Sequence, residues 1–292
     1  MESTQDFDAF LNQAWDDHVA DAPGVAKRLA STSLGLVRSD GDIAALTNLG
    51  HHVFGEHLGR WPEGVAYLQQ LAVHPACTTS CAQALERCTA SLLLCQGQED
   101  RRAPLSVSDR IRVTALAAGN LAARDPARSR SLLDEALVQA DLAALPDADP
   151  AHRSIAATSN GIAGTLEEKT DRNSAERALM IFAAQVARRF WARAGTWLET
   201  ERAEYRLAMT WLQAGDLPEA RRHAQACQEI VQANDGAALE RFFAWEALGA
   251  VERAAGNTTG HQHALAAATQ AFAELEDGDK GWCKASLDRL QG

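Results

Sequence analysis

Two short stretches decide the fold of this chain: Gly59–Gly64, which reads GRWPEG, and Gly215–Ala220, which reads GDLPEA. In each stretch a glycine suits the left-handed end of a helix, and a proline suits the first turn of the next helix. The glutamate that follows the proline is favoured there by the helix dipole. Both stretches therefore predict the same junction, in which one helix ends, the chain turns and a second helix begins.

The rest of the chain favours helices on both sides of these junctions. Ala, Leu, Arg, Glu and Gln are abundant, and these residues lose little on entering a helix. No alternating run of β-branched and aromatic residues predicts a strand. Turn-forming clusters such as RSDGD and LPDADPAH divide the chain into helices of ordinary length. We therefore predict an all-α protein.

A second motif lies downstream of the second junction. The segment AWEALGAVERAAGN contains Trp245-x-x-Leu248-Gly249, and the preceding segment reads YRLAMTWLQAGDLPEA. These segments resemble the tetratricopeptide repeat (TPR) family, whose unit carries W-x-x-L-G in its first helix and a small residue after the turn. The positions that match are Trp245, Leu248 and Gly249, and, one unit earlier, Leu207, Ala208, Trp211 and Ala220.

The resemblance covers Glu201–Leu275 and, less closely, Asp42–Ala72. It implies an α-solenoid of stacked antiparallel helix pairs, a TPR-like superhelix, as a single domain over residues 1–292. One helix pair cannot bury its apolar face alone, so neighbouring pairs stack into a continuous core. Residues 1–41 are expected to form an N-terminal helical cap, residues 42–281 the helix-pair repeats and residues 282–292 a C-terminal cap. Gly249 is expected to let two helices approach closely.

The charge of the chain excludes several partners. Lys and Arg number 28 against 39 Asp and Glu, a net charge of −11, which repels nucleic acid and anionic membrane surfaces. The N-terminus lacks the basic and apolar regions of a signal peptide, and no apolar run reaches the roughly 20 residues of a membrane span. We expect a cytoplasmic protein, and the excess of Arg over Lys with abundant Ala is typical of a bacterium with a GC-rich genome.

Histidines cluster just before the first junction, in HHVFGEHLGRWPEG. Zinc proteases use H-E-x-x-H or H-x-x-E-H on a helix, but the segment from His52 to His57 carries one residue too many for the second pattern. On a straight helix of about 100° per residue, His57 lies about 140° from His52, and His51 points to another side. The imidazoles are therefore expected not to converge, and neither a metal nor a cofactor is expected.

Four cysteines fall on one stripe of a helix: Cys77, Cys81, Cys88 and Cys95. In spacing alone they resemble the cysteine-lined helices of bacterial copper-storage bundles. A rise of about 1.5 Å per residue separates Cys81 from Cys88 by roughly 10 Å, so one ion would need ligands from another helix. Packing between helices is favoured. The alternative function left open is a metal-binding or thiol-based sensor that uses this stripe, with His74 nearby.

No catalytic motif is present: neither a nucleophile elbow nor a phosphate-binding loop occurs. We therefore expect no enzymatic activity. The TPR resemblance implies a scaffold whose concave face binds a protein or peptide. The positions it transfers to that face are Glu56, His57, Asn160, Arg202, Tyr205, Gln213, Glu246 and Arg253. Amide and guanidinium groups among them can satisfy the backbone of an extended peptide.

Overall fold

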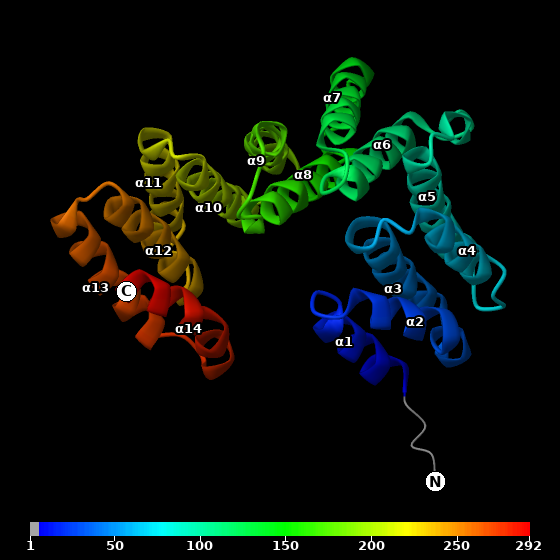
Figure 1. Ribbon diagram of the computed structural model, residues 1–292, viewed down its shortest axis with the longest axis horizontal. Helices are drawn as coiled ribbons and strands as arrows, with labels where there is room; N and C mark the ends of the chain where they lie inside the picture. Colours follow the sequence, from blue (N-terminus) through cyan, green and yellow to red (C-terminus); the bar gives the residue numbers. More distant parts are fainter. Residues whose placement is uncertain (1–5) are drawn as a thin grey trace, which may run out of the picture. The chain divides into compact units, whose positions relative to one another are not determined.

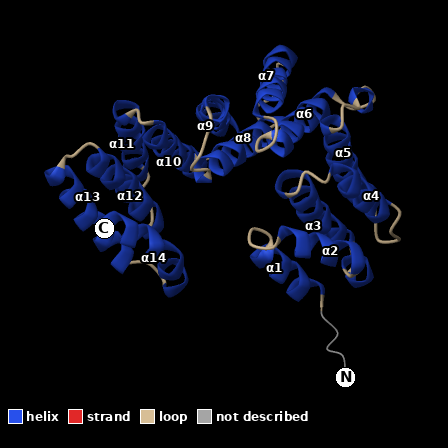
Figure 2. Ribbon diagram, viewed as in Figure 1, coloured by secondary structure: helices blue, strands red, loops and turns tan. Residues whose placement is uncertain are grey.

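The computed structural model describes residues 6–292, apart from the side chain of Asp100. Every regular element in this range is a helix, which confirms the all-α prediction (Figure 2). The first residues of the predicted N-terminal cap, 1–5, lie outside the described part. The chain divides into two compact units, Met1–Pro146 and Asp147–Gly292, hereafter unit 1 and unit 2.

Within residues 6–146, unit 1 contains seven α-helices and three short helices of other types. The α-helices are α1 (Phe7–Asp17), α2 (Ala22–Ser31), α3 (Asp40–His51), α4 (Trp61–Ala72), α5 (Thr79–Cys95), α6 (Val107–Leu121) and α7 (Pro126–Ala143). The short elements are the 3-10 helices η1 (Ser33–Leu36) and η3 (Glu99–Arg102) and the π-helix η2 (His52–His57). Helices from α3 to α7 pack against their neighbours in sequence, and α3 also contacts α5 (Figure 1).

Unit 2 contains seven α-helices. They are α8 (Pro150–Glu168), α9 (Ser174–Ala194), α10 (Trp197–Ala214), α11 (Leu217–Ala233), α12 (Ala238–Ala254), α13 (Thr258–Ala273) and α14 (Asp277–Gln291). From α8 to α13, each helix packs extensively on the next. Alternate helices also touch, since α10 contacts both α8 and α12, and α12 contacts α14. The predicted C-terminal cap, 282–292, falls within and just after α14.

Both predicted junctions are confirmed. Gly59 ends η2 and Gly215 ends α10, with φ angles of +62° and +84°, in the left-handed region that favours glycine. The prolines Pro62 and Pro218 lie in the first turns of α4 and α11, as their fixed φ favours. The same local chemistry therefore starts the second helix of a pair in each unit.

The close approach expected at Gly249 is also confirmed. A Cβ at this position of α12 would lie 2.9 Å from Leu290 Cδ1 and 3.3 Å from Ala264 Cβ. A side chain here would require the Leu290 side chain to shift and Ala264 to give way by a few tenths of an ångström. The glycine of the W-x-x-L-G motif therefore serves helix packing.

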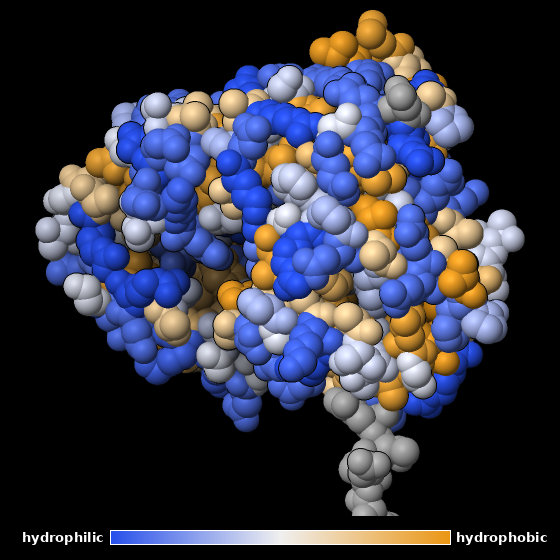
Figure 3. Space-filling model, turned by 45° about the vertical axis from the view of Figure 1, so that its right-hand side comes forward, coloured by the Kyte–Doolittle hydropathy of each residue, from blue (hydrophilic) through white to orange (hydrophobic). Residues whose placement is uncertain are grey.

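The two units fill their interiors differently. In unit 1 a single large cluster joins helices α1 to α5, and Phe10, Leu29, Leu46 and Leu68 are almost fully buried within it. Unit 2 has smaller clusters in which alanines such as Ala208, Ala220 and Ala247 form much of the contact between helices. On the face drawn in Figure 3, hydrophilic side chains cover much of the surface and hydrophobic side chains lie between them.

None of the helices in residues 6–292 combines the length and the apolar character that crossing a membrane requires. The cytoplasmic location remains a prediction from the sequence.

Candidate functional site

A pocket of about 430 Å³ opens in unit 2. Its lining comes from alternate helices of the unit, α8, α10, α12 and α14. The residues are Asn160 from α8; Glu201, Arg202, Tyr205 and Arg206 from α10; Leu239, Glu240 and Phe243 from α12; and Trp282 and Ser286 from α14. The pocket therefore lies on the face that the alternate helices share.

Three aromatic rings form one wall of this pocket. The ring centroids of Tyr205 and Phe243 are 5.5 Å apart, and those of Phe243 and Trp282 are 5.1 Å apart. Trp282 is 66% exposed, although a large apolar side chain is usually covered. The wall thus presents aromatic faces to anything that enters the pocket.

A buried carboxyl group also lines the pocket. Glu201 is only 1% exposed, and its carboxylate accepts a hydrogen bond from Cys227 Sγ at 2.9 Å. Burial raises the pKa of Glu201 to about 7, and no cationic side chain within residues 6–292 forms an ion pair with it. A second buried carboxyl, Glu246, lies behind the wall and accepts from the hydroxyl of Tyr205 at 2.9 Å. Burial raises the pKa of Glu246 as well.

The arginines of the pocket are already paired. Arg202 is 3.3 Å from Glu240, and Arg206 donates to Glu167 at 2.5 Å. The carboxamide of Asn160, by contrast, makes no hydrogen bond within the described chain and is half-buried. The pocket therefore offers an unpaired acid, an unpaired amide and aromatic faces, and the chemistry that complements them is a cation attached to a polar backbone.

The eight residues transferred from the TPR family have different locations. Asn160, Arg202 and Tyr205 line the pocket together, and Glu246 lies buried behind Tyr205. Outside the pocket, Gln213 accepts from Arg172 at 3.0 Å, and Arg253 donates to the Arg289 carbonyl. Glu56 and His57 belong to unit 1.

Sequence reasoning missed Glu201, Phe243 and Trp282, although the sequence contains a signal for each. Glu201 is four residues before Tyr205, one turn earlier on the same helix face. Tyr205, Phe243 and Trp282 are separated by 38 and 39 residues (243 − 205 and 282 − 243). This is close to a repeat period of 39 residues, which results if the 156 residues from Gly59 to Gly215 hold four units. An aromatic residue recurring at the repeat spacing therefore predicts a continuous wall.

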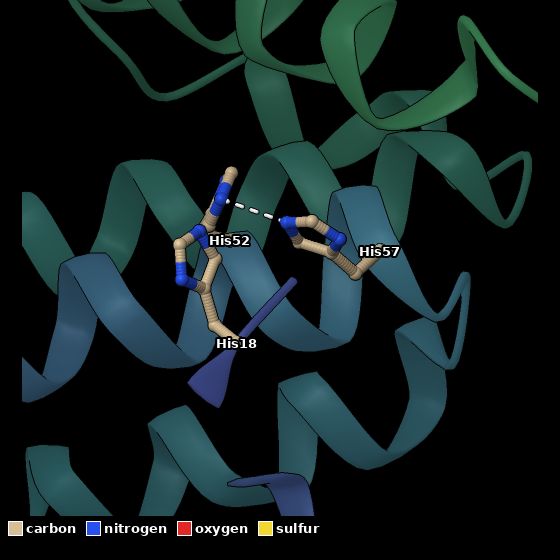
Figure 4. Close-up of side chains that lie close together, drawn as sticks. All are labelled: His18, His52 and His57. Carbon is tan, nitrogen blue, oxygen red and sulfur yellow. Dashed lines mark hydrogen bonds between the residues drawn. The ribbon is translucent and has the colours of Figure 1, made fainter. Parts of the chain in front are cut away.

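The expectation that the histidines cannot converge was wrong, because the chain around them is not a straight α-helix. After α3 ends at His51, η2 is a π-helix, in which the Leu58 N–H donates to the Val53 carbonyl at 3.0 Å. In a π-helix the hydrogen bonds join residues i and i+5, which brings the side chains of residues five apart toward the same side of the helix. The Nε2 atoms of His52 and His57 are consequently 2.9 Å apart, and His18 joins them from the end of α1 (Figure 4).

The neighbouring histidine has a different environment. His51 is buried, and its Nε2 lies 2.8 Å from Ser91 Oγ and 3.2 Å from Asn120 Nδ2. Burial lowers its pKa to about 4, so the ring is neutral in the core. His51 therefore packs in the core and, as expected, does not join the other imidazoles.

The cysteine stripe does not form a shared site. Cys81 Sγ is 3.3 Å from Cys77 Sγ, but Cys88 packs in the apolar core and Cys95 donates to the Ala117 carbonyl. Burial raises the pKa of Cys88 and of Cys95 to about 12, so both remain thiols. In the described part of the chain, three potential metal ligands come together at His18, His52 and His57 and not along α5.

Comparison with known proteins adds no name to these sites: no family model, no curated protein and no solved structure matches the chain. The function must therefore be argued from the side chains.

Proposed function

We propose that this chain is a non-catalytic scaffold, built of TPR-like helix pairs as an α-solenoid, that binds a protein or peptide segment. A basic side chain of the bound segment would enter the pocket of unit 2. The contacts among alternate helices support the solenoid, as does the recurrence of Tyr205, Phe243 and Trp282 at the repeat spacing. A binding surface on one face of stacked helices is the usual arrangement of such proteins.

The observation that carries the proposal is the carboxyl group of Glu201, buried at the pocket without a cationic partner. An ionised carboxylate in that position is unfavourable, because burial removes its water and no ion pair replaces it. A lysine or arginine side chain from a ligand would supply the missing charge. Its cationic group would also face the rings of Tyr205, Phe243 and Trp282, which attract cations through their π-systems.

The backbone of the same ligand has a partner in Asn160. Its carboxamide offers both a donor and an acceptor, and neither is used within residues 6–292. An extended peptide exposes N–H and C=O groups that need such partners. The pocket thus selects for a basic side chain on an extended backbone.

Glu201 also links binding to pH. Its pKa is about 7 in the free protein, and a bound cation would favour the ionised form and lower that pKa. Binding then releases protons near neutral pH, and the affinity for a basic peptide rises as the pH rises from about 6 to about 8.

The test is selection from a displayed library of random linear peptides against the full chain. We expect the selected peptides to share a lysine or arginine, and a synthetic peptide of the selected sequence to bind more weakly to Glu201→Gln and to Trp282→Ala. Glu229→Gln, an exposed carboxylate on α11, and Trp15→Ala, a partly exposed tryptophan of unit 1, are the matched controls and should bind normally.

Two results contradict the proposal. One is a library selection that enriches no basic residue. The other is a selected peptide that binds Glu201→Gln as tightly as it binds the unchanged chain over the whole pH range.

A further inference from the structure

Unit 1 contains three imidazoles that meet at one point, although they come from two separate segments. His18 follows the last residue of α1, and His52 and His57 are the two ends of η2 (Figure 4). One ring nitrogen from each lies within 4.8 Å of the others. All three side chains are half-buried, so the point where they meet is sheltered and still open to solvent.

The chain fixes the position of the two histidines in η2. The guanidinium of Arg124, after α6, donates to the carbonyls of Glu56 and His57 at 2.7 and 2.6 Å. Gly59 leaves room for this contact, because a Cβ there would lie 2.1 Å from Arg124 Nε. The end of the π-helix is therefore held by a neighbouring element, and the 2.9 Å approach of His52 to His57 is built into the fold.

Hydrogen bonds on the outer sides of two rings orient them toward the centre. His52 Nδ1 is 3.0 Å from the carboxylate of Glu56, and His18 Nδ1 bonds to the Trp15 carbonyl. Both partners are acceptors, so each Nδ1 carries the proton and each Nε2 presents a lone pair. A carboxylate or a backbone carbonyl behind the ring is the usual support of a metal-binding histidine.

His57 completes the set in its neutral form. Without an ion, its Nε2–H donates to the lone pair of His52 Nε2, which accounts for their short separation. A shift of its proton to Nδ1 leaves the ring neutral and directs a third lone pair to the centre.

We propose that His18, His52 and His57 bind one Zn²⁺ ion, with a solvent molecule as the fourth ligand. Neutral imidazole is a preferred ligand of Zn²⁺, whereas Mg²⁺ and Ca²⁺ take oxygen ligands. Zn–N distances of about 2.0–2.1 Å place the nitrogens of a tetrahedral site about 3.3 Å apart. His52 and His57 therefore separate by a few tenths of an ångström, while His18 moves inward.

The ion would join two segments that are far apart in the sequence. Helix α1 is held in the core of unit 1 by Phe7, Phe10 and Ala14, and its C-terminal end carries His18. A bond from His18 through the ion to η2 fixes that end as well. Because the ion binds the folded arrangement and not the unfolded chain, it stabilises unit 1 and protects the amides of α1 from exchange.

The test uses the full chain expressed without a histidine tag and freed of metal with chelator. Calorimetric titration with Zn²⁺ is expected to give one ion per chain, and Co²⁺ is expected to give the visible absorption of a tetrahedral site. His18→Ala, His52→Ala and His57→Ala should each weaken Zn²⁺ binding at least tenfold. His74→Ala, a half-buried histidine of the same unit outside the cluster, is the matched control and should bind normally.

Glu56 is a positioning residue in this site, and its variants test the geometry. Glu56→Ala removes the acceptor behind His52 and should weaken Zn²⁺ binding about tenfold. Glu56→Gln keeps an acceptor oxygen and should recover most of that loss. A surface histidine pair would not respond to this difference.

Three results overturn the proposal. They are the absence of stoichiometric Zn²⁺ binding, unchanged affinity in His18→Ala with normal circular dichroism, and amide exchange in α1 that is the same with and without Zn²⁺. The outcome is independent of peptide binding in unit 2, because none of the variants alters a residue that lines that pocket.

Discussion

The polar groups buried in unit 1 differ in charge from those buried in unit 2. In the described part of unit 1 they are hydroxyls, an amide and the neutral imidazole of His51. Unit 2 also buries hydroxyls and imidazoles, but it adds five carboxyl groups: Glu176, Glu201, Glu204, Glu246 and Glu252. Helices of similar composition can therefore pack around interiors that respond very differently to pH and to loss of a charge.

The carboxyl groups of unit 2 fall into two classes. Three form ion pairs: Glu176 with Lys169, Glu204 with Arg188 and His223, and Glu252 with Arg221. The other two, Glu201 and Glu246, accept only from the uncharged groups of Cys227 and Tyr205. Glu201 lines the pocket and Glu246 bonds to the pocket residue Tyr205, whereas none of the three paired carboxyls lines the pocket.

The largest effect is expected from removing the partner of a paired carboxylate. Arg221 donates to both oxygens of Glu252, at 2.7 and 2.9 Å. Arg221→Met leaves the carboxylate buried with only Asn257 as donor, and should lower the free energy of unfolding by about 3 kcal/mol. Chemical denaturation followed by circular dichroism measures this change.

The control for that change lies in unit 1. Arg60 pairs with Glu63 on the exposed first turn of α4. Arg60→Met should have no measurable effect, because water and salt already screen an exposed pair. Equal losses in the two variants would contradict the difference between the interiors.

A comparable effect, which appears only as the pH changes, is expected from the unpaired carboxyl of Glu201. Its pKa is 4.5 in the absence of burial and about 7 in the folded chain, so the folded state holds its proton more tightly. Between these values the folded state binds more protons, and stability falls as the pH rises. Relative to Glu201→Gln, the unchanged chain should lose roughly 3 kcal/mol between pH 4 and pH 8. Denaturation of both chains across this range measures the difference, and parallel curves would contradict it.

The parts of the fold that the sequence predicted are those set by the conformational preferences of individual residues. A glycine that can end one helix, followed by a proline that can start the next, predicted each of the two turns. The abundance of helix-forming residues predicted the all-α class. The close approach at Gly249 was predicted correctly because a residue without a side chain lets two helices pack closely. Asn160, Arg202 and Tyr205, which line the pocket together, came from the family resemblance.

The histidine cluster and the aromatic wall of the pocket were not predicted, because they depend on helix type and on contacts between helices that are distant in the sequence. The convergence of His52 and His57 requires a π-helix, with i→i+5 hydrogen bonds. Nothing in HHVFGEH indicates a π-helix in place of an α-helix with i→i+4 hydrogen bonds. His18 comes from a different helix altogether. Phe243 and Trp282 were available in principle, since they recur at the repeat spacing after Tyr205, but the W-x-x-L-G motif does not include their position.

The smallest predicted effect compares the two junctions themselves. After α10, the N–H groups of Gly215 and Asp216 donate to the carbonyls of Leu212 and Trp211, so the turn satisfies its own helix end. Gly215→Ala meets no atom within 4 Å and should lose only the preference of glycine for positive φ, about 1 kcal/mol.

Gly59→Ala carries the same backbone preference and one further effect. The new Cβ displaces Arg124, which then releases the carbonyls of Glu56 and His57. We expect a loss of about 2 kcal/mol, and little additional loss when Arg124→Ala is added, because both changes remove the same hydrogen bonds. A double-mutant cycle by denaturation measures that coupling. Equal losses at Gly59 and Gly215 would mean that the π-helix keeps its shape without Arg124, and that the approach of His52 to His57 originates within η2 alone.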